Sequence, residues 1–244
     1  MSPNEQGADS VTATVRLGLE PQLASIEARV IEMATATRRM LVDAGIAVQT
    51  MDAGRARAIV AADDAVDSTY LAVERAILDL LARQQPVASD LRRLMALLQT
   101  GMHLERMADT AVEVGRQVLR AGDLAPVPDL VRDLVKMGVR VRRMLDGALQ
   151  ALRERERDMC LAVVRLEGEL DELHEALFTH QAANAGEGLP LPVVLWIDRV
   201  ARLLQRAGQH AVDIAEAAWF QITGELREFD RDDSDVARTG AGEL

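Results

Sequence analysis

The stretch "RQQPVASDLRRLMALLQTGMHLERMADTAVEVGR", residues 83–116, decides the fold, because its apolar residues recur at the three- and four-residue steps of one long helix. On a helical wheel Glu105 falls close to Leu94 and Leu98, and Asp109 falls beside Leu91. Two acids in an apolar stripe must be paired, protonated or bound to a cation, because burying an uncompensated charge is costly. The stretch therefore predicts both a long packed helix and a cationic partner for its acids.

Composition points to an all-helical protein. Of the 244 residues, 49% are hydrophobic and only 2% are aromatic, and Ala, Val, Leu, Met, Glu and Arg dominate. The net charge of −11 argues against a nucleic-acid partner, which would require broad phosphate neutralisation. The same charge is compatible with binding cations or basic protein surfaces.

Other features bear on where the protein works. The single Cys160 excludes an internal disulfide, which favours a cytoplasmic location. No apolar run approaches the ~18 residues of a membrane span, and the first residues lack the basic and apolar regions of a secretory signal. Any role at a membrane is therefore expected to run through a partner.

The apolar pattern predicts six helices, separated by breaks rich in Gly, Pro or Asp. The first break is "MDAGR" (51–55), and the best linker candidate is "GDLAPVPD" (122–129), followed by a loop at "ANAGEGLPLP" (183–192). Residues 1–15 and 230–244 are predicted to be disordered. The six expected helices span about 21–50, 55–85, 86–121, 128–152, 155–182 and 192–225.

The two halves of the chain read as repeats. "LERMADTAVEVG" from residue 104 aligns with "LQRAGQHAVDIAE" from residue 204, and "IVAADDAVDSTY" from residue 59 aligns with "VVRLEGELDELH" from residue 163. A repeat of this length with three helices predicts two antiparallel three-helix bundles, at residues 16–122 and 128–226. The third helix of each bundle is expected to be long and to line the interface between them.

The chain resembles the PhoU family from its first helix to Glu225. Three motifs carry the resemblance: "RQQPVASDLR" (83–92), "LERMADTAVEV" (104–114) and the ending "HAVDIAE…ITGE" (210–225). The resemblance implies two three-helix bundles related by pseudo-two-fold symmetry, and a regulator that restrains phosphate uptake. Its implied partners are the ATPase of a phosphate ABC transporter, the associated sensor histidine kinase and further copies of the chain, as a homodimer or larger homo-oligomer.

The resemblance also implies a divalent or iron-type metal ion at the acidic motif of each repeat. In the first repeat the motif is Glu105 with Asp109, and further ligands would come from Asp63, Asp67 or Glu113. The second repeat departs from the pattern, because Gln205 and Gln209 stand at the matching places, and amides are weaker ligands than carboxylates. We therefore expect one metal site at most. The departure also suggests a divergent paralogue, for which a partner other than the transporter is the alternative.

An ion pair is the alternative to metal, with Arg116 on the same side of the helix as Asp109. The four histidines do not form a ligand-spaced set, and His103 and His210 are expected at the surface. The alternative for His210, which is next to Gln209, is that it contributes to a residual site in the second repeat. The acidic run at 167–175 reads as a solvated face, or as a docking surface for a basic partner.

The sequence contains no catalytic constellation, so a non-enzymatic binding protein is expected. One alternative is a carboxylate-metal storage protein or enzyme, but no Glu has a His three residues on, and Asp171 with His174 stands alone. The other alternative is a structural adaptor without metal.

Overall fold

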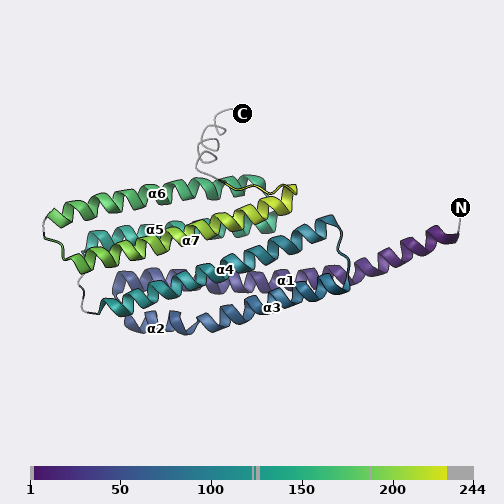
Figure 1. Ribbon diagram of the computed structural model, residues 1–244, viewed down its shortest axis with the longest axis horizontal. Coiled ribbons are helices and arrows are strands. Elements are labelled where there is room, and N and C mark those ends of the chain that lie inside the picture. The colour runs from purple at the N-terminus through teal and green to yellow at the C-terminus, as the bar shows by residue number, and fades with distance from the viewer. Residues whose placement is uncertain (1–2, 123, 125–126, 187, 230–244) are drawn as a thin grey trace, which may run out of the picture.

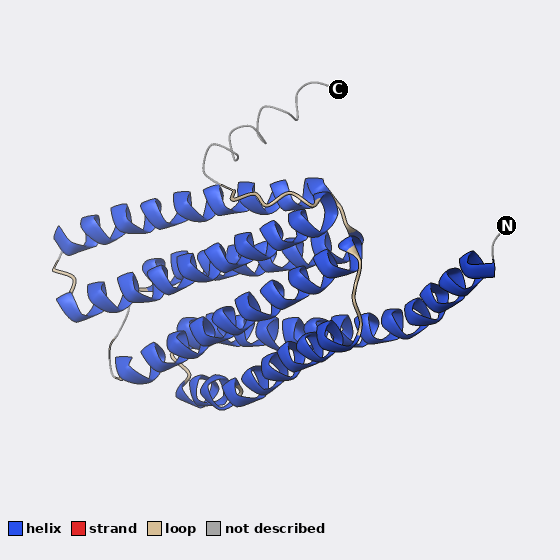
Figure 2. Cartoon of the chain, turned by 45° about the vertical axis from the view of Figure 1, so that its right-hand side comes forward, coloured by secondary structure: helices blue, strands red, loops and turns tan. Residues whose placement is uncertain are grey.

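The protein is an elongated stack of long helices. The computed structural model describes residues 3–122, 124, 127–186 and 188–229, and these residues contain helices and loops but no strand (Figure 1, Figure 2). The order is α1 (Pro3–Thr50), α2 (Ala53–Ala61), α3 (Asp63–Arg83), α4 (Ala88–Ala121), α5 (Pro128–Glu154), α6 (Arg157–Gly186) and α7 (Leu191–Thr223). The all-helical prediction is confirmed.

The helices form two antiparallel bundles of three. In the first bundle α1 and α4 pack on each other and on the α2–α3 pair, and in the second α5, α6 and α7 contact one another. The bundles meet through α4 against α7 and α1 against α5, so the long third helices lie at the interface as expected. Figure 1 shows α4 and α7 running in opposite directions along this seam.

The second predicted helix is interrupted. Asp52 caps the start of α2 by accepting hydrogen bonds from the backbone N–H groups of Gly54 and Arg55. Ala62 separates α2 from α3, and its N–H reaches the carbonyl oxygens of both Ala58 and Ile59. The first turn of α3 then begins with Asp63, whose charge is favourable at a helix N-terminus.

The first helix begins earlier than predicted. Sequence reasoning placed its start at about Pro21, after a small and polar N-terminal segment that was expected to be disordered. In the structure α1 continues through Pro21 to Pro3, and Leu19 and Leu23 are buried on either side of it. Residues 3–15 therefore belong to α1, whereas residues 1–2 and the predicted tail at 230–244 lie outside the described part of the chain.

Glycine ends the last helix. Gly224 has φ +79°, a left-handed conformation that glycine adopts without strain, and its N–H bonds to the carbonyl oxygen of Phe220. Beyond it, Phe229 returns to the bundle, and its N–H donates to Glu216. The chain thus closes over the end of α7 nearest to the start of α4, where Arg92 lies beside Gly224.

Candidate functional site

The predicted acidic motif lies on the surface between α3 and α4. The side chain of Glu105 is 20% exposed and that of Asp109 is 46% exposed, so both acids lie at the edge of the apolar core rather than inside it. Leu91, which the wheel placed beside Asp109, is exposed as well. Arg106 pairs with both acids, at 3.4 Å from Glu105 and 3.7 Å from Asp109.

Arg116 does not pair with Asp109, which was the alternative to metal offered from the sequence. Arg116 lies 3.7 Å from Glu113, which also accepts hydrogen bonds from Gln117 and Arg120. Glu113 is therefore engaged one turn beyond the motif, in its own set of contacts. Arg106 instead pairs with both motif acids, because its side chain is long and flexible enough to reach them.

Negative charge accumulates around the acidic motif. Burial, together with the charge of Asp109, raises the pKa of Glu105 and of Asp67. Burial and the charges of Asp67 and Asp109 also raise the pKa of Asp63, whose Oδ1 is buried without a hydrogen-bond partner among the described residues. The charge of this cluster fits a cation, but its ligand atoms do not converge: within the described ranges, the group of three ligands close enough to share an ion lies elsewhere.

In the second repeat an amide stands where the first repeat has an acid, and it avoids the repulsion between neighbouring carboxylates. The side-chain amide of Gln205 donates to Asp171 at 3.1 Å, which joins α7 to α6. The aligned pair in the first repeat is Glu105 and Asp67, two acids whose charges repel. The amide in the second repeat therefore replaces a repulsion with a hydrogen bond.

We expect Glu105→Gln to stabilise chelator-treated protein at neutral pH. An acid whose folded pKa is raised contributes full stability below its ordinary pKa of 4.5 and loses it as pH rises through the folded pKa, so the wild type has lost this contribution at neutral pH. A gain of about 1 kcal/mol corresponds to a Tm rise of about 2–4 °C. The gain should vanish in acid.

The reciprocal change, Gln205→Glu, is the matched control, because it places a second acid beside Asp171 and should lower Tm at neutral pH. Thermal unfolding across a pH series measures both variants. A lower Tm for Glu105→Gln at neutral pH would show that Glu105 is already compensated in the folded protein.

A second group of polar residues lies where α4 crosses α7. His103 Nδ1 and His210 Nδ1 each lie 3.1 Å from Asp213 Oδ2 and 3.4 Å from one another. The histidine side chains are 17% and 16% exposed, so the prediction of surface histidines was wrong for both. Burial alone would raise the pKa of Asp213, but hydrogen bonds from the two imidazoles outweigh it and hold that pKa well below its usual range.

Sequence reasoning missed this group because its members come from different repeats. His103 lies on α4, whereas His210 and Asp213 lie on α7. The antiparallel crossing brings them together, since each step toward the end of α4 is matched by a step toward the start of α7. The contact between Gln117 and Trp196 follows the same register. A signal was available in the sequence: His103 in the stretch 83–116, and His210 with Asp213 in the matching helix of the second repeat, could have been compared by placing the two helices antiparallel.

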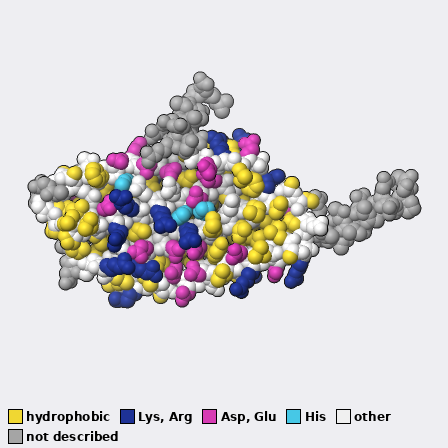
Figure 3. Space-filling model, in the orientation of Figure 1, with side chains coloured by type: hydrophobic (Ala, Val, Ile, Leu, Met, Phe, Trp, Pro, Cys, Tyr) yellow, Lys and Arg dark blue, Asp and Glu magenta, His cyan; other side chains and the backbone are white. Residues whose placement is uncertain are grey.

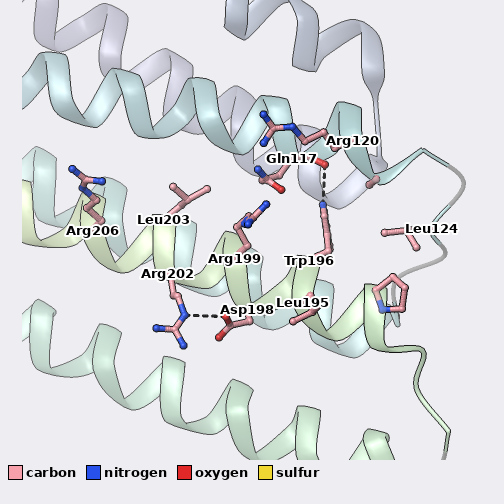
Figure 4. A pocket seen from close by; sticks show the side chains of 12 residues that line it. Gln117, Arg120, Leu124, Leu195, Trp196, Asp198, Arg199, Arg202, Leu203 and Arg206 are labelled. Carbon is pink, nitrogen blue, oxygen red and sulfur yellow. Dashed lines mark hydrogen bonds and ion pairs between the residues drawn. The ribbon is translucent and has the colours of Figure 1, made fainter.

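Two grooves flank this crossing, one toward each end of the contact between α4 and α7. The first, of about 650 Å³, is lined by residues from the end of α4 and the start of α7 (Figure 4). The second, of about 540 Å³, is lined by residues from the other ends of the same helices. Alignment of the repeats matches Arg199 with Gln99, Leu203 with His103 and Arg120 with Phe220, which are walls of opposite grooves.

The two grooves have opposite charge. The first, here called the basic groove, carries Arg120, Arg199, Arg202 and Arg206, with Asp198 paired to Arg202 at 2.9 Å. The second, the acidic groove, is lined by Asp213, Glu216 and Glu228, together with His103 and Arg227. Figure 3 shows basic side chains gathered on the left part of this face and histidines near its centre.

Fold and sites together define a duplicated helical protein with two grooves and a polar group along the seam between its halves. No helix in the described part of the chain has the length and apolar character needed to span a lipid bilayer. Two segments, residues 30–118 and 134–218, match the PhoU domain. The chain therefore belongs to the PhoU family, and the resemblance stated from its motifs is confirmed.

Individual relatives agree with this assignment. The chain is 31% identical over 205 residues to a phosphate-specific transport system accessory protein PhoU homolog of Caulobacter vibrioides, covering 84% of this chain and 89% of the relative. It is 27% identical to the accessory protein PhoU of Escherichia coli, covering 84% and 85%. The crystal structure of PhoU from Pseudomonas aeruginosa superposes with a TM-score of 0.80 at 25% identity, covering 85% of this chain and all of the other.

Proposed function

We propose that this protein regulates phosphate uptake and phosphate-responsive signalling by binding a component of a phosphate transport system. The observation that carries the proposal is the pair of PhoU domains, since the relatives that share them are named accessory proteins of phosphate-specific transport. The candidate partners are the ATPase of a phosphate ABC transporter and its sensor histidine kinase. The protein acts by binding rather than by catalysis.

The basic groove is the proposed docking surface. The chain has a net charge of −11, so a groove with four arginines stands out against an acidic molecule. Arg199 and Arg206 are exposed, and neither has an ion-pair partner among the described residues (Figure 4). Trp196 and Leu203 give the groove an apolar floor between these charges. An acidic segment with an apolar anchor is the occupant that fits both properties.

A pull-down tests the proposal directly. Tagged protein is recovered from cells grown with ample phosphate and from phosphate-starved cells, and the bound proteins are identified by mass spectrometry. Wild type should recover the transporter ATPase or the kinase, and Arg199→Glu with Arg206→Glu should reduce this recovery more than about tenfold, because two attractions become repulsions.

The matched control is Arg29→Glu with Arg75→Glu, which reverses two exposed arginines on α1 and α3, away from the seam. This variant has the same net charge as the groove variant and should retain binding. Equal losses in both variants would assign the effect to overall charge. Absence of any transport or signalling component from the wild-type sample would overturn the proposed function and favour a paralogue with another partner.

A metal ion at Glu105 and Asp109 stays a prediction. The unpaired Oδ1 of Asp63 and the mutual repulsion of the cluster support it. The pairing of both motif acids with Arg106 opposes it, since that arginine must move to admit an ion. Self-association as a homodimer or larger homo-oligomer also stays a prediction, which sedimentation analysis tests.

A further inference from the structure

The polar group at the crossing of α4 and α7 has the geometry of a metal centre. Its three possible ligand atoms, His103 Nδ1, His210 Nδ1 and Asp213 Oδ2, are separated by 3.1, 3.1 and 3.4 Å. Zinc bonds to imidazole nitrogen and carboxylate oxygen are about 2.0–2.2 Å long, so tetrahedral coordination places neighbouring ligand atoms about 3.3–3.5 Å apart. The three atoms therefore surround one point at the distance that such an ion requires.

Hydrogen bonding alone explains this arrangement less well. If both imidazoles donate from Nδ1 to Asp213, their two N–H groups face one another across 3.4 Å, which is unfavourable. If one imidazole presents its lone pair instead, it faces the lone pairs of the carboxylate oxygen at 3.1 Å. A cation at the centre removes both conflicts, because all three atoms then act as ligands.

The chemistry of the ligands selects the kind of ion. Two imidazoles and one carboxylate suit zinc and neighbouring divalent transition metals, whereas magnesium and calcium prefer sites made wholly of oxygen. A further coordination position opens toward the acidic groove, whose wall includes Glu216 and Gln99. Water can occupy that position.

The site would join the two repeats. One ligand comes from the third helix of the first bundle and two come from the third helix of the second bundle. It is separate from the predicted acidic motif, whose residues Glu105 and Asp109 lie on the side of α4 that faces α3. We propose that His103, His210 and Asp213 bind one divalent transition-metal ion of the zinc class, which fastens α4 to α7 at the centre of the seam.

Zinc loading of the purified full-length protein tests this proposal. After chelation, dialysis and reloading with zinc, elemental analysis should give one equivalent per chain held at the crossing. His103→Gln and His210→Gln should each weaken zinc binding by more than about 100-fold in a chelator competition, since loss of a ligand exceeds the effect of losing an outer hydrogen bond. Magnesium should not compete with zinc.

Two variants serve as controls. His180→Gln alters an exposed histidine of α6 that pairs with Asp133, so it should bind zinc as the wild type does. Glu105→Gln with Asp109→Asn removes the acidic motif and should also retain the ion at the crossing. Loss of zinc from this second variant alone would move the site to the acidic motif and overturn the proposal, as would normal zinc binding by both histidine variants.

A measurement on the wild type covers the case in which a histidine variant fails to fold. Cobalt in the site should give the intense visible absorption of low-symmetry coordination, and zinc should displace it. Zinc should also shift the NMR signals of the His103 and His210 imidazoles and leave those of His180 unchanged. Absence of a selective shift in these two rings would refute the site even if zinc bound elsewhere. Neither readout depends on finding the transport partner.

Discussion

Replacing Trp196 by alanine should destabilise the protein by about 3–5 kcal/mol, the range for a large aromatic side chain lost from a core. Trp196 lies on α7, is only 5% exposed and packs into the seam. Its Nε1–H donates to the backbone carbonyl oxygen of Gln117 on α4 at 3.0 Å. Alanine would remove both the packing and this link between the repeats, and would take away part of the apolar floor of the basic groove.

Trp196→Phe separates these two contributions. The phenyl ring retains most of the apolar contact but cannot donate, so this variant should lose only about 1–2 kcal/mol, for the hydrogen bond and the smaller ring. Urea unfolding at equilibrium gives both values. If alanine proved no more damaging than phenylalanine, Trp196 would be a surface feature of the groove rather than a structural link.

Gly115→Val should destabilise the protein by about 2–3 kcal/mol, because it overpacks a close approach between α2 and α4. A Cβ at Gly115 would lie 3.1 Å from the carbonyl oxygen of Ala56 and 3.7 Å from the Cβ of Ile59. A backbone oxygen cannot rotate away as a side-chain end can, so α2 itself must shift. The β-branched valine adds two methyl groups to this contact.

Gly45→Ala is the control for the effect of glycine as such. Gly45 lies within α1, and a Cβ there would meet nothing within 4 Å. Alanine should therefore stabilise the protein by about 0.5–1 kcal/mol through helix propensity alone. Differential scanning calorimetry of both variants should give Tm changes of opposite sign. An unchanged Tm for Gly115→Val would mean that α2 shifts without cost, and a lower Tm for Gly45→Ala would mean that α1 is crowded at this position.

Periodicity was sufficient to predict the helices, because their apolar faces are long and their loops contain proline and glycine. It could not predict the break at Ala62, since the residues around it, Val60 to Val66, continue an acceptable helical pattern. It also began the first helix too late in the chain, because residues 1–15 are small and polar and were expected to be disordered. In the structure, packing on both sides of Pro21 carries the helix through it.

The candidate sites divide along a similar line. The acidic motif could be recognised within one helix, because Glu105 and Asp109 are four residues apart. The histidine group and the basic groove depend on how α4 and α7 pass one another, and the register of two helices is not written in either of them. Even within the motif, a helical wheel shows which side of the helix a residue is on but not how deeply it is buried. It therefore could not distinguish the half-buried Glu105 from the more exposed Asp109.

The opposite charge of the two grooves has a consequence for orientation. A duplicated scaffold with identical halves would present two equivalent faces, and a partner could bind it either way round. Here the positions that carry Arg199 and Arg120 in one groove carry Gln99 and Phe220 in the other. The divergence of the halves makes the two ends of the seam chemically different, so a partner that spans the seam would bind in one orientation only.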